Sequence, residues 1–268
     1  MPTLKPIALH YEQQGSGLPL LLIHGLGSSG LDWEYQVPAF AKTFRVITVD
    51  LRGHGLSPRP AGPYSISGMA ADVLALLDEL GIASAHVVGL SMGGAVAFQI
   101  AADAPQRIRS MTIVNSGPHM VLTTLRQKLA IGIRVPIVKL LGLPTMGKMI
   151  SQKLFPDPAH QQLRDTFVER LSRNDKAAYI ASLRALIGWS VQARLSAMHC
   201  PTLVITADQD YSPVSLKEQY VALMPKAQLV VVPNSHHALP LERPEAFNKV
   251  LAEFLATQDA SPALDPSL

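Results

Sequence analysis

The chain has 268 residues, of which 48% are hydrophobic and 16% charged, and its formal net charge is +3. This length and composition exclude a disordered chain and are typical of a globular protein with a full core, while the small net charge argues against nucleic-acid binding. The single cysteine, Cys200, cannot form an internal disulfide and is expected as a small buried hydrophobe in a reducing compartment.

The N-terminal region shows no targeting or membrane segment. The first 17 residues are mixed and polar, and the apolar run Leu18–Ile23 is far too short to span a membrane. We therefore expect a cytoplasmic protein without an integral membrane segment.

Short apolar runs predict seven strands, separated by helical patterns. The predicted strands are Ala8–Gln13, Leu18–Ile23, Phe44–Val49, His86–Gly89, Arg109–Val114, Thr202–Thr206 and Gln228–Val232. The predicted helices are Met69–Leu80 (with Ser65 or Ser67 as N-cap and Gly81 as stop), Ser215–Met224 and Pro244–Leu255. The later strands are continuously apolar, as in parallel strands buried on both faces. The alternation predicts an α/β fold with a doubly wound, mostly parallel sheet.

The alternation breaks between residues 119 and 192, where apolar residues recur at helical spacing. We expect a helical cap, or lid, at 119–192, inserted into a core formed by 1–118 and 193–257. Residues 258–268 contain turn formers without periodicity and are expected to form a flexible tail.

The segment 104–156 has no Asp or Glu but has eight Lys or Arg. This segment fits a solvated basic surface, a charge that attracts an anionic substrate, or a lid that settles on lipid interfaces.

The pentapeptide Gly89-Leu90-Ser91-Met92-Gly93 lies between a predicted strand and a run of small, helix-compatible residues. A serine between two glycines at such a strand-to-helix turn is typical of a nucleophile elbow, in which the hydroxyl is exposed at the edge of the sheet. Ser91 is therefore the candidate nucleophile.

A serine hydroxyl needs a base to remove its proton and a carboxylate to orient that base. The next two strands end at Asp208-Gln209-Asp210 and at His236-His237, which supplies both groups in chain order. The strand that ends at Ile23 is followed by His24-Gly25-Leu26-Gly27. We expect the backbone N–H groups of Leu26 and Met92 to form an oxyanion hole.

These landmarks resemble the α/β-hydrolase superfamily along nearly the whole chain, from Leu9 to Leu255. Among its members the chain is most similar to capped esterases and 3-oxoadipate enol-lactonase-like proteins, through Arg52-Gly53-His54-Gly55 and Pro63-Tyr64-Ser65-Ile66. The resemblance implies that His237 is the base rather than His236, and the spacing before Pro213 favours Asp210 over Asp208 as the acid. Ala207 and His236 stand where the family usually has glycine.

We thus predict a serine hydrolase that cleaves a small-molecule carboxylic ester or lactone through an acyl-enzyme, with the triad Ser91, His237 and Asp210. The alternatives are a carbon–carbon bond hydrolase or a perhydrolase with the same triad, or a non-catalytic ligand receptor on the same fold. No cofactor and no metal are implied, because no phosphate loop, dinucleotide fingerprint or metal-ligand cluster occurs in the sequence. The oligomeric state stays open.

Other conspicuous residues have simpler interpretations. Asp50 and His54 lie in a turn-rich segment and are expected to be structural, and Trp33 is expected to pack a loop rather than contact substrate. Three methionines, Met120, Met146 and Met149, fit either an acyl pocket or ordinary cap packing.

Overall fold

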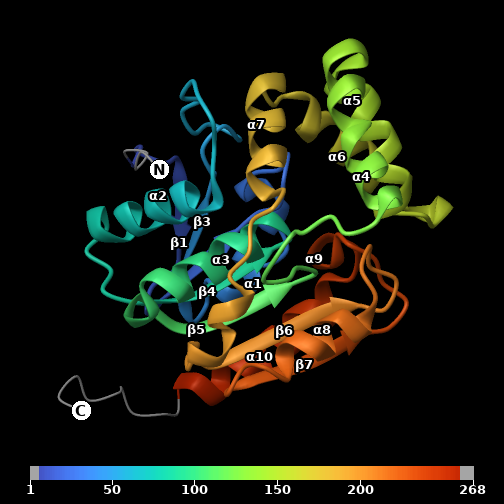
Figure 1. The fold of residues 1–268 in the computed structure, drawn as a ribbon. Helices are drawn as coiled ribbons and strands as arrows, with labels where there is room; N and C mark the ends of the chain where they lie inside the picture. The colour runs from blue at the N-terminus through green and yellow to red at the C-terminus, as the bar shows by residue number, and fades with distance from the viewer. Residues whose placement is uncertain (1–5, 260–268) are drawn as a thin grey trace.

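The computed structural model describes residues 6–259, in which one seven-stranded sheet forms the centre of the molecule (Figure 1). Its strands are β1 (Tyr11–Gln14), β2 (Leu18–Ile23), β3 (Phe44–Val49), β4 (Ala85–Leu90), β5 (Ile108–Val114), β6 (Thr202–Ala207) and β7 (Ala227–Val232). Their order in space is β1-β3-β2-β4-β5-β6-β7. Only the β1–β3 pairing is antiparallel, which confirms the predicted doubly wound, mostly parallel sheet.

The first strand is shorter than predicted at its beginning. The sequence predicted a strand from Ala8, but β1 begins at Tyr11. The antiparallel register pairs Tyr11 with Val49, which is the last residue of β3. Residues before Tyr11 therefore have no β3 residue left to pair with.

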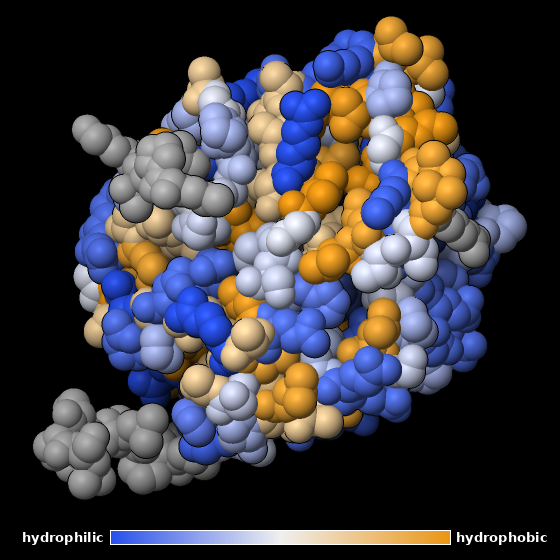
Figure 2. All heavy atoms as spheres, viewed as in Figure 1, coloured by the Kyte–Doolittle hydropathy of each residue, from blue (hydrophilic) through white to orange (hydrophobic). Residues whose placement is uncertain are grey.

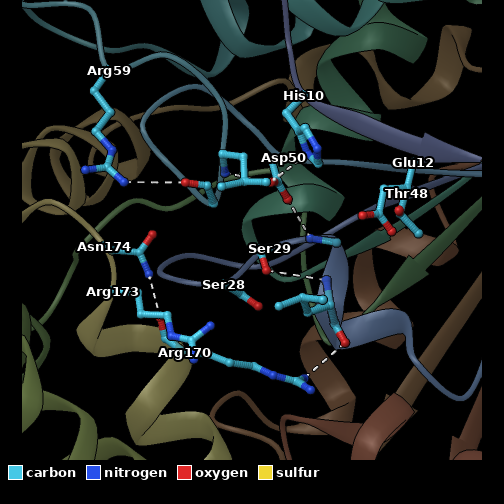
Figure 3. A pocket seen from close by; sticks show the side chains of 14 residues that line it. His10, Glu12, Ser28, Ser29, Thr48, Asp50, Arg59, Arg170, Arg173 and Asn174 are labelled. Atoms are coloured by element: carbon cyan, nitrogen blue, oxygen red, sulfur yellow. Dashed lines mark hydrogen bonds and ion pairs between the residues drawn. The ribbon is translucent and has the colours of Figure 1, made fainter.

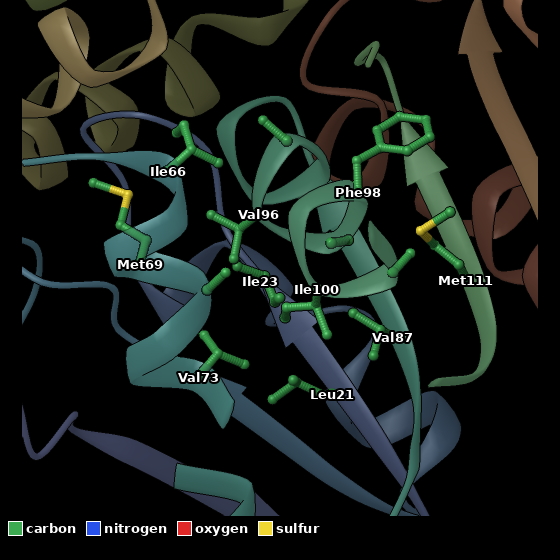
Figure 4. Close-up of a cluster of buried hydrophobic side chains, with 14 of the residues drawn as sticks. Leu21, Ile23, Ile66, Met69, Val73, Val87, Val96, Phe98, Ile100 and Met111 are labelled. Carbon is green, nitrogen blue, oxygen red and sulfur yellow. The ribbon is translucent and has the colours of Figure 1, made fainter. Parts of the chain in front are cut away.

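Helices cover both faces of the sheet. These helices are α1 (Val37–Phe40), α2 (Ile66–Glu79), α3 (Met92–Asp103), α8 (Val214–Val221), α9 (Leu239–Glu242) and α10 (Pro244–Asp259). The strand β2 is buried on both sides, because its alternate residues point to opposite faces. Leu21 and Ile23 pack with α2 and α3 (Figure 4), whereas Leu20 and Leu22 pack in the cluster that contains Phe247 of α10.

The ends of two helices differ from the prediction. Ser65 is the N-cap of α2, because its Oγ accepts a hydrogen bond from the Gly68 N–H at 3.0 Å, and the helix begins at Ile66 rather than Met69. The last helix, α10, runs to Asp259, so the predicted flexible tail is helical at residues 258 and 259. The rest of that tail, 260–268, lies outside the described residues.

Four α-helices lie between β5 and β6, beside the carboxyl edge of the sheet (Figure 1). They are α4 (Leu125–Gly132), α5 (Arg134–Leu154), α6 (Gln161–Ser172) and α7 (Lys176–Leu186). We call them the helical insertion. Where the chain enters and leaves it, His119 and Ser190 form an isolated antiparallel bridge.

The stretch Gln127–Leu154, within α4 and α5, is by length and composition apolar enough to cross a membrane. Its backbone is not one continuous helix, because Gly142 has non-helical dihedrals (φ 84°, ψ 173°) and Pro144 follows. Each piece is then shorter than the roughly 20 residues that a spanning helix needs. Its buried residues Val138, Leu143 and Met146 pack with Tyr179 of α7, so the stretch forms part of a helical cluster.

Candidate active site

Ser91 occupies a strained turn between β4 and α3. Its backbone has φ 53° and ψ −112°, a conformation that residues other than glycine rarely adopt. A Cβ on Gly93 would lie 2.1 Å from the Ile23 carbonyl oxygen, and one on Gly89 would lie 2.3 Å from that of Gly93. Both glycines are therefore required for the close approach of β2, β4 and α3, and this geometry is that of a nucleophile elbow.

Asp210 and His237 come together at the ends of the next two strands. The Nδ1–H of His237 donates a hydrogen bond to Asp210 Oδ1 at 2.5 Å, which leaves Nε2 as the free acceptor. The Tyr211 ring stacks on His237 with ring centroids 4.2 Å apart. Burial by itself raises the pKa of Asp210, but the hydrogen bond and charge of His237 and the charge of Lys217 outweigh it, so the pKa lies well below the ordinary value.

The neighbouring candidates His236 and Asp208 have other partners. His236 lies 2.7 Å from Glu242 Oε1 through its Nδ1. Asp208 accepts the backbone N–H groups of Asn234 and Ser235 at 3.0 and 3.1 Å, which shapes the turn after β7. Neither side chain is among the described residues that line the cavity at Ser91.

The loop after β2 lies against the nucleophile. A Cβ on Gly25 would be 3.4 Å from Ser91 Cβ, and both Leu26 and Met92 line the cavity that contains Ser91 and His237. Met92 is the first residue of α3, where an N–H has no acceptor within the helix. Both predicted oxyanion-hole residues therefore line the cavity that contains Ser91.

His24 anchors this loop. Its Nδ1–H donates to the Gly25 carbonyl at 2.7 Å, and its Nε2 accepts the Leu51 N–H at 3.0 Å. Complete burial lowers the pKa of His24, so the imidazole stays neutral and keeps this tautomer. The His24-Gly25 pair thus joins the loop to the end of β3.

Asn115 and Ser116, which follow β5, were not predicted as site residues. Asn115 Nδ2 donates to the carbonyls of His236 and His237 at 3.2 and 2.9 Å, and its Oδ1 accepts the Ala207 N–H at 2.8 Å. The Ser116 hydroxyl donates to the Ser91 carbonyl at 2.6 Å. Their position directly after an apolar strand is the signal that could have suggested them, since the carboxyl ends of parallel strands meet at one edge.

The sequence profile of the alpha/beta hydrolase family matches residues 20–250. This chain belongs to the alpha/beta hydrolase family. The RutD protein of Stutzerimonas stutzeri, named as a candidate carbamate hydrolase, is 33% identical over 93% of this chain and 97% of the relative.

Two solved structures are also similar to this alpha/beta hydrolase. The thermophilic esterase of Thermogutta terrifontis is 28% identical with TM-score 0.85, covering 93% of each chain. The enol-lactonase of Burkholderia xenovorans LB400 is 26% identical with TM-score 0.86, covering 92% of this chain and 96% of that structure. The family, the fold and the resemblance to esterases and enol-lactonases are thereby confirmed, and this chain is a hydrolase by homology.

The cavity of this hydrolase has a volume of about 510 Å³ and lies between the sheet edge and the helical insertion. Its wall is mainly apolar, with residues from the loops after β2 and β5, from α4 to α7 and from α9. One guanidinium, that of Arg134, is among the lining groups, and its charge acts on the phenol of Tyr179, which lines the same cavity.

The three methionines that the sequence left open have different places. Met120 lines the cavity, Met146 is buried within the helical insertion, and Met149 is half exposed. Trp33 is fully buried against Phe247, with ring centroids 6.3 Å apart, and does not line the cavity, as expected for a packing role.

The outer face of α4 and α5 is apolar and exposed, and Figure 2 shows hydrophobic residues gathered over the helical insertion. Leu125 and Leu140 are 72% and 82% exposed. Lysines such as Lys128 and Lys139 lie on the same helices, within the segment that has no Asp or Glu. This face therefore combines exposed leucines with positive charge.

A second cavity, of about 290 Å³, lies on the other side of the loop after β2 (Figure 3). Its polar groups largely satisfy one another. Asp50 accepts the N–H groups of Gly30 and Leu56 at 2.7 and 2.9 Å, and Arg170 bonds the Leu31 carbonyl at 3.0 Å. These contacts fit the structural role expected of Asp50. Within residues 6–259, no group of three or more His, Cys, Asp or Glu side chains is arranged to hold a metal ion.

Proposed function

We propose that this alpha/beta hydrolase cleaves a carboxylic ester or lactone through an acyl-enzyme. In this mechanism Ser91 attacks the carbonyl carbon while His237 Nε2 accepts the hydroxyl proton, and Asp210 holds the imidazole in the required tautomer. The N–H groups of Leu26 and Met92 stabilise the negative charge on the carbonyl oxygen. His237 then protonates the leaving alcohol, and a water molecule activated by the same histidine releases the acid.

The observation that carries this proposal is the 2.5 Å hydrogen bond between His237 and Asp210. His237 lines the same cavity as Ser91. A serine elbow alone could be a structural remnant, whereas an oriented imidazole in the wall of the same cavity supports a role for His237 as the base. The names of the relatives, which include an esterase and an enol-lactonase, support acyl transfer as the reaction class.

The test is labelling and turnover in the full chain. A fluorophosphonate probe is expected to label Ser91, and Ser91→Ala should lose both labelling and p-nitrophenyl acetate turnover by several orders of magnitude. Ser116→Ala is the matched control, because Ser116 lines the same cavity but its hydroxyl donates to the Ser91 carbonyl. Labelling at another serine, or turnover retained in Ser91→Ala, would refute the proposal.

The substrate proposed for this cavity is an apolar acyl compound with a negatively charged group. Arg134 lies among apolar lining residues, in the segment that has no Asp or Glu, and can bind a carboxylate at a distance from the scissile bond. The bond that this hydrolase cleaves can be identified with a panel of substrates: p-nitrophenyl esters of rising chain length, simple and enol lactones, and carbamates. Steady multiple turnovers support an enzyme, whereas a stoichiometric burst alone supports a ligand receptor.

The helical insertion is proposed to act as the cap of this site, with 1–118 and 193–257 as the catalytic core. Support comes from the cavity wall, to which both parts contribute: Ser91 and His237 from the core, Ile131 and Leu183 from the insertion. A cytoplasmic location is part of the proposal, since Cys200 has no cysteine to pair with.

A further inference from the structure

Lys217 of α8 is buried in direct contact with the proposed catalytic acid. Its Nζ lies 2.6 Å from Asp210 Oδ2, and both side chains are 1% exposed. Few lysines are buried so deeply without a partner that compensates the charge. The carboxylate of Asp210 therefore faces two cations or potential cations, His237 on Oδ1 and Lys217 on Oδ2.

The contacts of Lys217 define its charge. An ammonium group has three N–H donors, and Nζ has three acceptors at 2.6 Å: Asp210 Oδ2, the Ser212 carbonyl and Ser212 Oγ. A neutral amine has only two N–H donors and could not donate to all three acceptors. The arrangement is thus matched to the protonated lysine.

The same contacts fix the orientation of the carboxylate. The Ser212 hydroxyl also donates to Asp210 Oδ2, at 3.0 Å. With Oδ2 held by Lys217 and Ser212, rotation of the carboxyl group would break these bonds, so Oδ1 stays directed at His237. The His237–Asp210 geometry is consequently set from α8 as well as from the two strand ends.

We propose that Lys217 is a positioning residue for the acid of the triad, fixing Asp210 Oδ2 and offsetting part of its negative charge. This inference rests on the proposed function. During the reaction His237 takes up a positive charge, which Asp210 favours and the nearby ammonium opposes. Lys217 therefore offsets part of the stabilisation that the Asp210 carboxylate gives to the charged imidazole.

The other ionisable groups near Asp210 and Lys217 do not offset the charge of Asp210 in place of Lys217. They are Tyr211, Tyr220, Tyr179, Arg134, His119, Asp208 and the His236–Glu242 pair. Burial raises the pKa of both Tyr211 and Tyr220, so these phenols stay neutral at the pH of the reaction. His236 and Glu242 bind each other, and the charge of Arg134 acts on the phenols of Tyr179 and Tyr211.

The experiment is the pH dependence of kcat/KM for p-nitrophenyl acetate, followed at the isosbestic wavelength of the phenol from about pH 5 to 9. Lys217→Gln, which keeps a donor but removes the charge, should shift the acid limb to higher pH by about one unit, as expected for a charge a few ångströms away. Lys217→Met should show at least that shift together with a lower plateau, because Oδ2 also loses its donor. Lys217→Arg should keep the wild-type limb.

The control variant is Lys226→Met, which removes an exposed lysine beyond the end of α8. It should leave the profile unchanged. A Lys217→Gln variant with native circular dichroism and an unshifted acid limb would overturn the inference, since a purely structural lysine lowers activity equally at every pH. When the limb is unshifted and Ser91→Ala is inactive in the same assay, only the role of Lys217 is refuted. When Ser91→Ala is active, the proposed function itself is refuted.

Discussion

Asn115 is expected to hold the catalytic histidine loop, and its replacement should affect stability and activity separately. Asn115→Ala removes the two bonds to the carbonyls of His236 and His237 and leaves the buried Ala207 N–H without an acceptor. That buried N–H costs about 1–3 kcal/mol. Because Asn115 has φ 45°, alanine adds about 1 kcal/mol for the left-handed backbone. The free energy of unfolding should fall by about 2–4 kcal/mol.

The effect on activity comes from His237, whose carbonyl loses its 2.9 Å donor. A displacement of the imidazole by about 1 Å can cost up to about 100-fold, so we expect kcat/KM to fall by about 10- to 100-fold. Urea unfolding followed by circular dichroism and p-nitrophenyl acetate hydrolysis measure the two effects. Thr206→Val is the control, because it removes the hydroxyl contacts to Asn115 Oδ1 and to the Ala207 carbonyl, at 3.2 and 3.3 Å, but leaves the bonds from Asn115 to the His236 and His237 carbonyls. The reasoning is refuted if folded Asn115→Ala keeps kcat/KM within about twofold of wild type.

Two further predictions concern the triad and the substrate. His237→Ala and Asp210→Asn should reduce kcat severely. His236→Gly and Asp208→Asn should stay within about tenfold of wild type, because they leave the 2.5 Å bond between His237 and Asp210 intact. A folded but inactive His236→Gly variant would show that the base is His236 and not His237. For an anionic ester, kcat/KM should fall as ionic strength rises and fall further in Arg134→Gln, with a neutral ester of equal size unaffected by either change. Equal responses of the two esters would show that Arg134 does not bind the substrate, and a jump in rate above the solubility limit of the ester would instead indicate a lid that settles on lipid interfaces.

Local patterns were sufficient for much of the fold. Strands such as Leu18–Ile23 and Phe44–Val49 were predicted to the residue, because each is a mainly apolar run between polar or turn-forming residues. The start of β1 was wrong because an edge strand ends where its partner ends, and the length of β3 is not visible in the residues of β1. The elbow was recognisable because Gly89 and Gly93 are required by contacts within one short strand–turn–helix unit and the adjacent strand.

Lys217 shows why other parts of the site were missed. On α8 it stands three residues before the buried Tyr220, on the same side of the helix, and the buried Met224 follows just after the helix ends. A lysine is unexpected at such a position. That spacing was a signal of a buried charge. The partner, however, is Asp210 in the preceding loop, and nothing in the spacing alone shows that the loop folds back over α8.

The sequence by itself determined the order of strands and helices along the chain and the serine elbow, because these depend on neighbouring residues and on periodicity. With the family resemblance it also predicted His237 and Asp210 over His236 and Asp208. Only the tertiary structure shows that His237 and Asp210 meet. His237 reaches Asp210 while His236 turns to Glu242, and Asn115, which follows β5, holds the carbonyls of both histidines. Such choices depend on contacts between segments more than 100 residues apart, and no local pattern contains them.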